Sequence, residues 1–324
     1  MIDLVAEQAP LGGLERWLRD PSVNELMVNA GSEIWAERAG VVAHVGRMRP
    51  ATLLATIEHI LTPIGRRLDR AHPMVDARLP DGSRVCAVIA PIAVDGPCLA
   101  IRRFHQRTLG LDRFAPSAIV PLLRELVQRR CNVIVSGATS SGKTTLLNTL
   151  ALEIEPGARV ITLEDTAELH LPHPHVVRLE TREATPDGVG EVTLAHLLRT
   201  ALRLRPDRLV VGEIRGDEAV HLLQALNTGH DGSMATVHAN SAADALARLS
   251  SLVLQEVGNW PLVAVQQHVA RAVDAVVHVA RAGDGARTVV EVVEVLADVN
   301  GPTLATRQLA TQSSITGMLQ RGRQ

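Results

Sequence analysis

The sequence predicts an α/β fold with a mostly parallel sheet in its larger part, preceded by a smaller α+β part. From Ser117 onward, segments with helical spacing alternate with short apolar runs rich in β-branched residues, which is typical of parallel strands joined by helices. Before residue 104, short strand-like and helix-like segments are separated by Gly and Asn. At 324 residues and 46% hydrophobic composition, the chain is long enough for two domains that each bury a core.

The first part is expected to contain several short elements. Helices are expected at residues 14–18 and 52–61, and strands at residues 25–28, 33–37, 41–45 and 99–101. Asp81 and Gly82 separate two further strand-like segments, 75–79 and 84–89. An Asp-Gly pair in this setting favours a tight turn, so we expect a β-hairpin here.

Breaks in the pattern indicate the domain boundaries. Residues 1–104 are predicted as the first domain. Residues 105–116 lack periodicity and contain two Gly/Pro breaks, so they are predicted as a linker. Residues 117–302 are predicted as the second domain, and the polar residues 303–324 as a flexible tail.

The composition argues against direct nucleic-acid binding. The formal net charge is -2, and the chain has no Tyr, two Phe and three Trp. A nucleic-acid site usually needs a basic surface, and a single-stranded one also needs aromatic side chains on which bases stack. A local basic patch is compatible with this composition, but direct nucleic-acid binding is not expected.

The three cysteines give no sign of a metal site or a disulfide. Cys86, Cys98 and Cys131 show no CxxC spacing. Cys86 and Cys131 lie within apolar runs, so we expect buried, reduced thiols of a cytosolic protein.

No segment is predicted to cross or enter a membrane. No apolar run approaches the ~20 residues needed to span a bilayer. The first residues lack the charged-then-apolar pattern of an export signal. We therefore expect a cytoplasmic protein that would serve a membrane only as a peripheral partner.

The clearest functional signal is a Gly-rich segment that fits the pattern GxxxxGK[ST]. It consists of Gly137, Ala138, Thr139, Ser140, Ser141, Gly142, Lys143 and Thr144, with Thr145 behind it. An apolar strand at 132–136 precedes the segment and a helix at 144–152 follows it, which is the setting that a phosphate-binding loop requires. Its backbone amides can converge on phosphate oxygens at a helix N-terminus. Lys143 is expected to bridge the β- and γ-phosphates of ATP, and the Thr144 hydroxyl to bind Mg²⁺.

Three further apolar strands end in polar residues suited to phosphate chemistry. Residues 159–163 end in Glu164 and Asp165, residues 208–211 in Gly212 and Glu213, and residues 233–237 in His238. In open α/β sheets, ligands bind beyond the carboxyl ends of the strands.

Each of these side chains is assigned a role. Glu164 is expected to orient or deprotonate the attacking water. Glu213 resembles the acidic residue that ends a Walker B strand and holds Mg²⁺, although Gly212 stands where Asp is usual. His230 and His238 are candidates for sensing a γ-phosphate.

Every one of these residues also has a structural alternative. A single Glu at a strand end is usually a helix cap or a surface charge, and a single His is more often structural. The recurrence of acidic strand ends after the phosphate-binding loop favours the catalytic interpretation for Glu164 and Glu213. For His230 and His238 both interpretations stay open.

Several arginines are candidates to contact the phosphates. A cation beside the transferred phosphoryl group stabilises its charge. Arg84, Arg102 and Arg103 lie beside strands of the first part, and Arg215 lies in the second. For any single arginine a surface salt bridge is the default. Arg102 and Arg103 are the best candidates because a nucleotide cleft is expected where the domains meet.

Several segments together resemble the type II/type IV secretion ATPases, and within them the CpaF/TadA branch of tight-adherence (Flp-type) pilus assembly, often labelled conjugal-transfer-associated. The matching segments are residues 79–84, 101–104, 137–145, 162–165, 205–216 and 228–240. The last two, which contain GEIRG and TGHDGSMATVHAN, are far more specific than the phosphate-binding loop. The resemblance covers about residues 15–297.

The resemblance implies a RecA-like P-loop ATPase domain preceded by a PAS-like α+β domain, a homo-hexameric ring, and ATP between the two domains. It matches Lys143 and Thr144 to the Walker A motif, Glu164 to the catalytic glutamate and Glu213 to the Walker B glutamate. It further matches His230 and His238 to the histidine box, and the arginines 84, 102 and 103 to residues that reach the phosphates. Arg215 is expected to sense the phosphates together with these two histidines.

The resemblance also implies partners. An inner-membrane platform protein is expected, with a pilin-like or conjugation-linked cargo. The sequence departs from longer relatives in starting almost directly at the first domain, and from some relatives in lacking a tetracysteine zinc module.

Two other functions stay open. The first is a nucleotide-gated structural ring with little turnover, against which Lys143, Thr144, Glu164 and Glu213 argue. The second is a DNA translocase, against which the charge and the missing aromatic residues argue.

Overall fold

The chain forms two compact units, Met1–Arg107 and Thr108–Gln324. The structure is a computed structural model, which describes residues 11, 13–30, 32–38, 40–103, 109–182, 184, 188–282, 285–297 and 303–323. Each unit has its own sheet and its own core.

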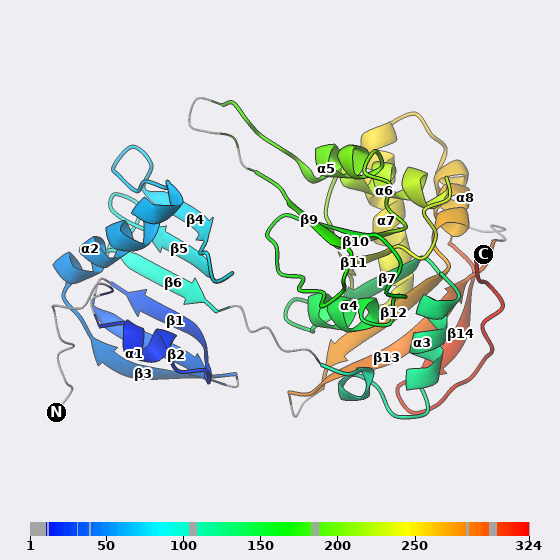
Figure 1. Ribbon diagram of the computed structural model, residues 1–324, viewed down its shortest axis with the longest axis horizontal. Helices are drawn as coiled ribbons and strands as arrows, with labels where there is room; N and C mark the ends of the chain where they lie inside the picture. The colour runs from blue at the N-terminus through cyan, green and yellow to red at the C-terminus, as the bar shows by residue number, and fades with distance from the viewer. Residues whose placement is uncertain are drawn as a thin grey trace. The chain divides into compact units, whose positions relative to one another are not determined.

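The first unit is a six-stranded antiparallel sheet with helices on one face (Figure 1). The strand order is β3-β2-β1-β6-β5-β4. The strands are β1 (Val23–Asn29), β2 (Glu33–Arg38), β3 (Val41–Arg47), β4 (Met74–Arg78), β5 (Arg84–Val88) and β6 (Cys98–Arg102), and the helices are α1 (Glu15–Leu18), α2 (Pro50–Leu61) and the 3-10 turn η1 (Thr62–Ile64).

The core of this unit forms because the strands and helices each present one apolar face. In β1, Val23, Leu26 and Val28 are buried, and in α2 the residues Leu53 and Ile57 follow at helical spacing. These side chains belong to one hydrophobic cluster. The helices and strands therefore occur where the sequence predicted them, in an α+β arrangement.

The predicted hairpin is present between β4 and β5. Its ends pair in antiparallel register, and the Leu79 carbonyl accepts a hydrogen bond from the Gly82 amide at 2.9 Å. Gly82 has a φ of 88°, which a residue with a side chain rarely adopts. The Asp81 carboxylate accepts a hydrogen bond from the Ser83 amide, so the Asp-Gly pair supplies both the acceptor and the left-handed residue of the turn.

The second unit is built on an eight-stranded mixed sheet in the order β14-β13-β12-β7-β11-β10-β8-β9. The six strands from β12 to β9 are parallel, and β13 and β14 add to the β12 edge in antiparallel pairing. The strands are β7 (Val133–Gly137), β8 (Val160–Glu164), β9 (Val176–Glu180), β10 (Arg208–Ile214), β11 (Met234–His238), β12 (Ala275–Arg281), β13 (Arg287–Val295) and β14 (Thr306–Thr311). The mostly parallel sheet that the sequence predicted is confirmed.

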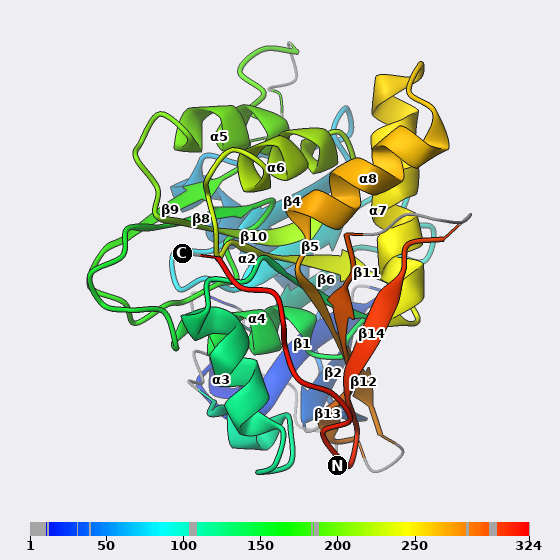
Figure 2. The ribbon, with the colours of Figure 1, turned by 90° about the vertical axis from the view of Figure 1, so that its right-hand side faces the viewer.

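Helices cover both faces of this sheet (Figures 1 and 2). The helices α3 (Val120–Gln128) and α4 (Lys143–Ala151) pack on one face with the 3-10 turn η2 (Leu111–Arg113), and the helices α5 (Leu194–Ala201), α6 (Glu218–Leu226), α7 (Ala242–Val257) and α8 (Leu262–Ala272) pack on the other. Because both faces are covered, every residue of β7 and β8 is buried. This burial explains why these strands read as continuous apolar runs.

Parallel pairing brings the polar strand ends to a single edge. In the register of β11 and β7, His238 lies opposite Gly137. In the register of β10 and β8, Val211 lies opposite Leu163, one residue before Glu164. The phosphate-binding loop, Glu164, Glu213 and His238 therefore lie at the carboxyl edge of one sheet.

The end of the chain differs from the expected flexible tail. Residues 306–311 form β14, which pairs with β13 over the residues Glu291 to Val295. Leu309, Ala310 and Leu319 are buried in the core under α3. The polar composition misled the prediction because it hid a short strand in which the adjacent residues Leu309 and Ala310 are both buried.

Two arginines near the end of the chain close on a buried carboxylate. The side chain of Asp274 is only 1% exposed. Its Oδ1 lies 3.0 Å from Arg321 Nε, and its Oδ2 lies 2.8 Å from Arg323 Nε. Its Oδ2 also accepts the backbone N–H of Asn132, the residue before β7. Arg323 further contacts Asp231, in the connection that leads into β11. This cluster fixes the starts of the two strands whose other ends carry the phosphate-binding loop and His238.

The expected linker also differs in part. Its residues 105–108 lie outside the described residues. Residues 109–116 belong to the second unit, where Leu111, Phe114 and Ala115 are buried beside α3. The Phe114 carbonyl accepts a hydrogen bond from Val289 on β13. Sequence periodicity could not reveal these contacts because the segment has only an irregular turn.

One cysteine prediction is wrong. Cys131 is buried, as expected, and burial raises the pKa of its thiol to about 12. Cys86, however, is exposed on β5, because it lies on the face of the first sheet opposite the helices. Its neighbours Val85 and Ala87 supply the apolar character of the run from the other face.

Replacing Asp274 with Ala is expected to lower the free energy of unfolding by about 3 kcal/mol, because it leaves two guanidinium groups and a buried amide without their acceptor. Denaturant unfolding of the full chain measures this change. Glu256→Ala, at an exposed carboxylate of α7, serves as the control and should change stability by less than ~0.5 kcal/mol. Equal losses in the two variants would contradict the role given to Asp274.

Candidate functional site

The Gly-rich loop leaves β7 and enters α4 through two glycines that no larger residue could replace without strain. A Cβ on Gly137 would lie 2.4 Å from Ser141 Oγ and from the Val279 carbonyl. Gly142 caps α4 at a φ of 95°, in the left-handed region. Between them, Ala138, Thr139 and Ser140 are exposed. The loop therefore presents its backbone to solvent at the start of α4, where the first N–H groups have no partner within the helix.

Lys143, the first residue of α4, is the single lysine among the 33 lysines and arginines of the chain. It is 7% exposed, and its Nζ lies 2.9 Å from the Ala138 carbonyl and 3.3 Å from His238 Nε2. Burial lowers the pKa of the ammonium, while nearby Glu213 acts in the opposite direction. Among the described residues, the hydrogen-bond partners of this buried ammonium are a carbonyl and an imidazole, which it can exchange for an anion.

Glu213 joins the cationic groups at the edge of the sheet. Its Oε2 lies 2.5 Å from Arg215 Nη2, and its Oε1 lies 3.3 Å from His238 Nε2. Arg215 Nη1 reaches Asp165 Oδ2 at 3.3 Å. Side chains at the carboxyl ends of β8, β10 and β11 thus form one chain of contacts. It runs from Asp165 through Arg215, Glu213 and His238 to Lys143.

The pKa of the His238 imidazole is lowered below its ordinary value in this chain of contacts. Burial is the first cause and the charge of Lys143 is the second, while Glu213 opposes both. The imidazole is therefore neutral at neutral pH, and its Nε2 can either accept from Lys143 or donate to Glu213.

Glu164 is a second carboxylate in a different environment. It is 2% exposed, and burial raises its pKa from 4.5 to about 7. Its Oε1 accepts hydrogen bonds of 2.8 Å from the amides of Glu168 and Leu169. Its Oε2 is buried and has no hydrogen-bond partner among the described residues. A carboxyl group with one oxygen fixed and one unused, and with a pKa near neutrality, is suited to general base catalysis.

The space for Glu164 comes from Gly212. A Cβ on Gly212 would lie 2.9 Å from Glu164 Cγ and 3.5 Å from its Oε1. Thr236 on β11 donates a hydrogen bond of 2.6 Å to the Gly212 carbonyl and fixes this backbone. The glycine that departs from the usual Walker B aspartate is therefore required by the side chain of Glu164.

The residues present fit a Mg²⁺ ion that is shared with phosphates. The described residues contain no group of three or more His, Cys, Asp or Glu side chains that could hold a metal alone. Mg²⁺ bound with nucleotides normally takes only one or two protein ligands, the rest being phosphate oxygens and water. Glu213 Oε1 is buried without a hydrogen bond among the described residues, and the Thr144 hydroxyl lies one residue beyond Lys143.

The structure does not bring every predicted residue to this edge. His230 precedes β11 by several residues, at the opposite edge of the sheet, and its Nδ1 lies 3.1 Å from the Ala225 carbonyl. In the first unit, Arg103 donates to the carbonyls of Asp20 and Val23. Contact of Arg103 with phosphates stays a prediction.

The other two arginines of the first unit lie side by side. Arg84 on β5 pairs in register with Arg102 on β6, and Arg84 lies 3.7 Å from Asp76. Arg102 is exposed. Their predicted contact with phosphates also stays a prediction.

One neighbour of the loop escaped the sequence analysis. A Cβ on Gly142 would lie 2.6 Å from Cδ of Arg287, which opens β13. The methylene groups of Arg287 therefore lie directly on the loop. Arg287 comes from a distant hairpin with no motif of its own, so only the fold reveals this contact.

Comparison with known proteins gives a consistent result. The family model described as "Type II/IV secretion system protein" matches residues 7–319. A putative conjugal transfer protein of Mycobacterium tuberculosis is 36% identical over 302 residues, which are 89% of this chain and 85% of that protein. The conjugal transfer protein TrbB of Rhizobium radiobacter is 36% identical over 280 residues, 83% of each chain.

A solved structure agrees at the level of the fold. The ATPase DotB of Legionella pneumophila superposes with a TM-score of 0.63 at 20% identity, covering 92% of this chain and 85% of that chain. The superposition confirms the predicted α/β fold. Among the described residues, no helix combines the length and the apolar character needed to cross a bilayer.

Glu164→Gln is expected to stabilise the protein increasingly as the pH rises. In the folded wild type the carboxyl group keeps its proton up to a pH of about 7, whereas the unfolded chain loses it near 4.5. Wild-type stability from this group is therefore present at low pH and is lost between pH 4.5 and about 7, by about 3 kcal/mol. Gln keeps the acceptor for the two amides and does not titrate.

Denaturant unfolding at pH 5 and pH 8 without nucleotide measures this difference. Glu191→Gln, at an exposed position, is the control and should follow the wild type at both values. A gap between Glu164→Gln and wild type that stays constant with pH would contradict the raised pKa.

Proposed function

The chain belongs to the type II/IV secretion system protein family, and we propose that it is a Mg²⁺-dependent ATPase that drives a secretion or conjugal-transfer machine. The observation that carries this proposal is the buried Glu164, with a pKa of about 7, at the same sheet edge as the phosphate-binding loop. A loop alone supports nucleotide binding, whereas a base beside it supports hydrolysis.

Binding of ATP begins with an exchange of partners at Lys143. Its Nζ leaves the Ala138 carbonyl and His238 and moves to the β- and γ-phosphate oxygens. The amides of the loop and the first turn of α4 donate to the same phosphates, and Ser140, with a φ of 60°, helps to keep the loop open for them. Release from Lys143 leaves His238 Nε2 free to donate to Glu213 or to a phosphate oxygen.

Hydrolysis uses Glu164 as the base. Its unpaired Oε2 accepts a proton from water as the water oxygen bonds to the γ-phosphorus. The bond between the γ-phosphorus and the bridging oxygen breaks, and its electron pair stays on ADP. The two amides on Oε1 hold the carboxylate in place.

Glu213 and Thr144 would hold Mg²⁺, which when bound neutralises phosphate charge and orients the β- and γ-oxygens. Arg215 holds Glu213 in position, and Asp165 in turn holds Arg215. Glu213 thus acts as a ligand rather than as the base, because its contacts with Arg215 and His238 hold its carboxylate at the edge of the sheet.

The family membership also supports a setting for this activity. We infer a homo-hexameric ring that docks on a membrane platform protein from the cytoplasmic side. The conjugal transfer relatives support conjugation-linked cargo over other cargo. The narrower assignment to the CpaF/TadA branch stays a prediction.

Lys143→Ala is expected to abolish ATP binding, and Glu164→Gln to preserve binding while lowering turnover by about 10²-fold to 10⁴-fold. The first variant removes the cation that receives the phosphates, and the second removes the base without removing its hydrogen-bond acceptor. Steady-state phosphate production and equilibrium binding of a fluorescent ATP analogue measure the two effects.

Lys143→Arg is the matched control for charge, since a guanidinium keeps the charge but does not fit the buried point contact. Equal turnover in the wild type and in both loss variants would refute the proposed ATPase.

Gly212→Ala is expected to lower kcat by about 10-fold to 100-fold with little change in KM for ATP. The added Cβ would displace Glu164, and a small displacement of a base is costly in rate. Gly216→Ala is the control, because its Cβ would meet only Glu218 at 3.4 Å. If both variants kept full kcat, the fit between Gly212 and Glu164 would not matter for catalysis.

A further inference from the structure

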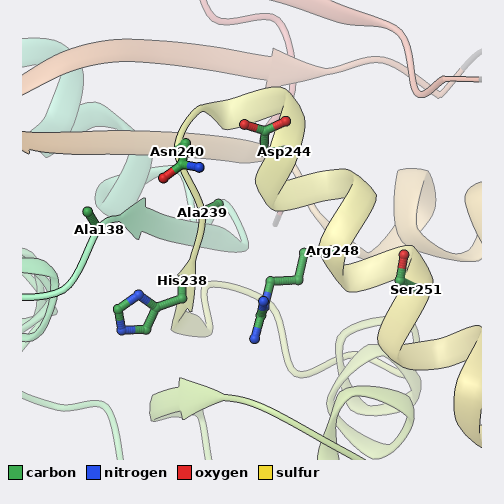
Figure 3. A pocket seen from close by; sticks show the side chains of 7 residues that line it. All are labelled: Ala138, His238, Ala239, Asn240, Asp244, Arg248 and Ser251. Carbon is green, nitrogen blue, oxygen red and sulfur yellow. The ribbon is translucent and has the colours of Figure 1, made fainter.

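A cavity of about 470 Å³ opens beside the phosphate-binding loop, on the side of α7 (Figure 3). Its lining comes from the loop, from the end of β11 and from one face of α7: Ala138, His238, Ala239, Asn240, Asp244, Arg248 and Ser251. None of these residues except Ala138 and His238 belongs to the site described above.

We propose that this cavity receives the inorganic phosphate released by hydrolysis and that Arg248 is the cation that draws it out of the phosphate-binding loop. The phosphate comes from the reaction proposed above, so the assignment rests on that function. The proposal assigns Arg248 as a residue that guides the product and the cavity as the route by which the phosphate leaves.

The cavity shares its wall with the reaction site. Ala138, whose carbonyl holds Lys143, is also part of the cavity lining. His238, whose Nε2 lies 3.3 Å from both Lys143 Nζ and Glu213 Oε1, lines the cavity as well. An anion that leaves Lys143 past His238 therefore enters this space without crossing the sheet.

Arg248 supplies the attraction. Within the described part of the chain it forms no ion pair and no hydrogen bond, in contrast to Arg215, which is held by Glu213 and Asp165. Figure 3 shows its side chain extending from α7 on the side of the cavity where the His238 ring lies. An unpaired guanidinium in the lining of this cavity can donate several hydrogen bonds to an anion.

The other polar residues of the cavity lining suit weak, short-lived binding of phosphate. The Asn240 amide and the Ser251 hydroxyl can donate to phosphate oxygens, and Asp244 can accept the proton of a protonated phosphate. The carboxylate of Asp244 also limits the affinity, which favours onward release. At roughly 30 Å³ per water, the cavity has room for a hydrated phosphate. No Phe, Tyr or Trp side chain lines it, which argues against a base-binding pocket.

The test separates hydrolysis from release in a single turnover of the full-length protein. Rapid chemical quench measures cleavage of ATP, and a fluorescent phosphate sensor measures the appearance of free phosphate. In Arg248→Ala we expect cleavage at the wild-type rate and release slower by about 10-fold, the lower end of the effect of electrostatic steering. Arg248→Lys should restore most of the release rate, since it restores the charge.

Arg203→Ala is the matched control, because Arg203 is exposed beyond α5, before the start of β10. It should leave both rates unchanged. Three results would overturn the proposal: unchanged release in Arg248→Ala, slowed cleavage in Arg248→Ala, which would make Arg248 part of the chemical step, or a loss of oligomeric mass, which would make the cavity a contact between subunits. Absence of cleavage in the wild type would instead refute the ATPase itself.

Discussion

The charged edge of the second sheet depends on the ion pair between Glu213 and Arg215. The side chain of Glu213 is 17% exposed, and its 2.5 Å contact with Arg215 compensates its charge beside the buried strand ends. The pair also links its neighbours, since Arg215 reaches back to Asp165 and Glu213 reaches across to His238. These side chains are close enough for contact because parallel pairing places the ends of β8, β10 and β11 at one edge of the sheet. A single ionic contact thereby organises groups that are far apart in sequence.

Two carboxylates at this edge take different roles because their surroundings differ. Glu213 lies between Arg215 and His238, which contact its two carboxylate oxygens. Glu164 is enclosed by apolar groups and the backbone of Gly212, so its charged form is disfavoured and its pKa lies at about 7. Two carboxylates with separate roles, one as a metal ligand and one as a titrating base, allow metal binding and proton transfer in one site.

Much of this arrangement could be predicted from the sequence, since the loop and the strand ends are local patterns. The strands around Val133 and Val160 and the helix at Lys143 were predicted within a few residues. Contacts between distant segments could not be predicted. The polar end of the chain gave no sign that Arg321 and Arg323 would close on Asp274, and the exposure of Cys86 depends on which face of a sheet is covered. Gly212 departs from the usual Walker B residue, and only the fold shows that Glu164 occupies the space that a larger side chain would need.

The solitary lysine has a consequence for spectroscopy. Because the chain uses arginine at all its other strongly basic positions, isotopic labelling of lysine alone would introduce one side-chain amine signal, and it would come from Lys143. Guanidinium groups form paired, planar contacts with carboxylates, whereas an ammonium is a compact charge that moves easily between acceptors. The residue that must change partners during a catalytic cycle is therefore also the one that can be followed, without any mutation, as the nucleotide arrives and departs.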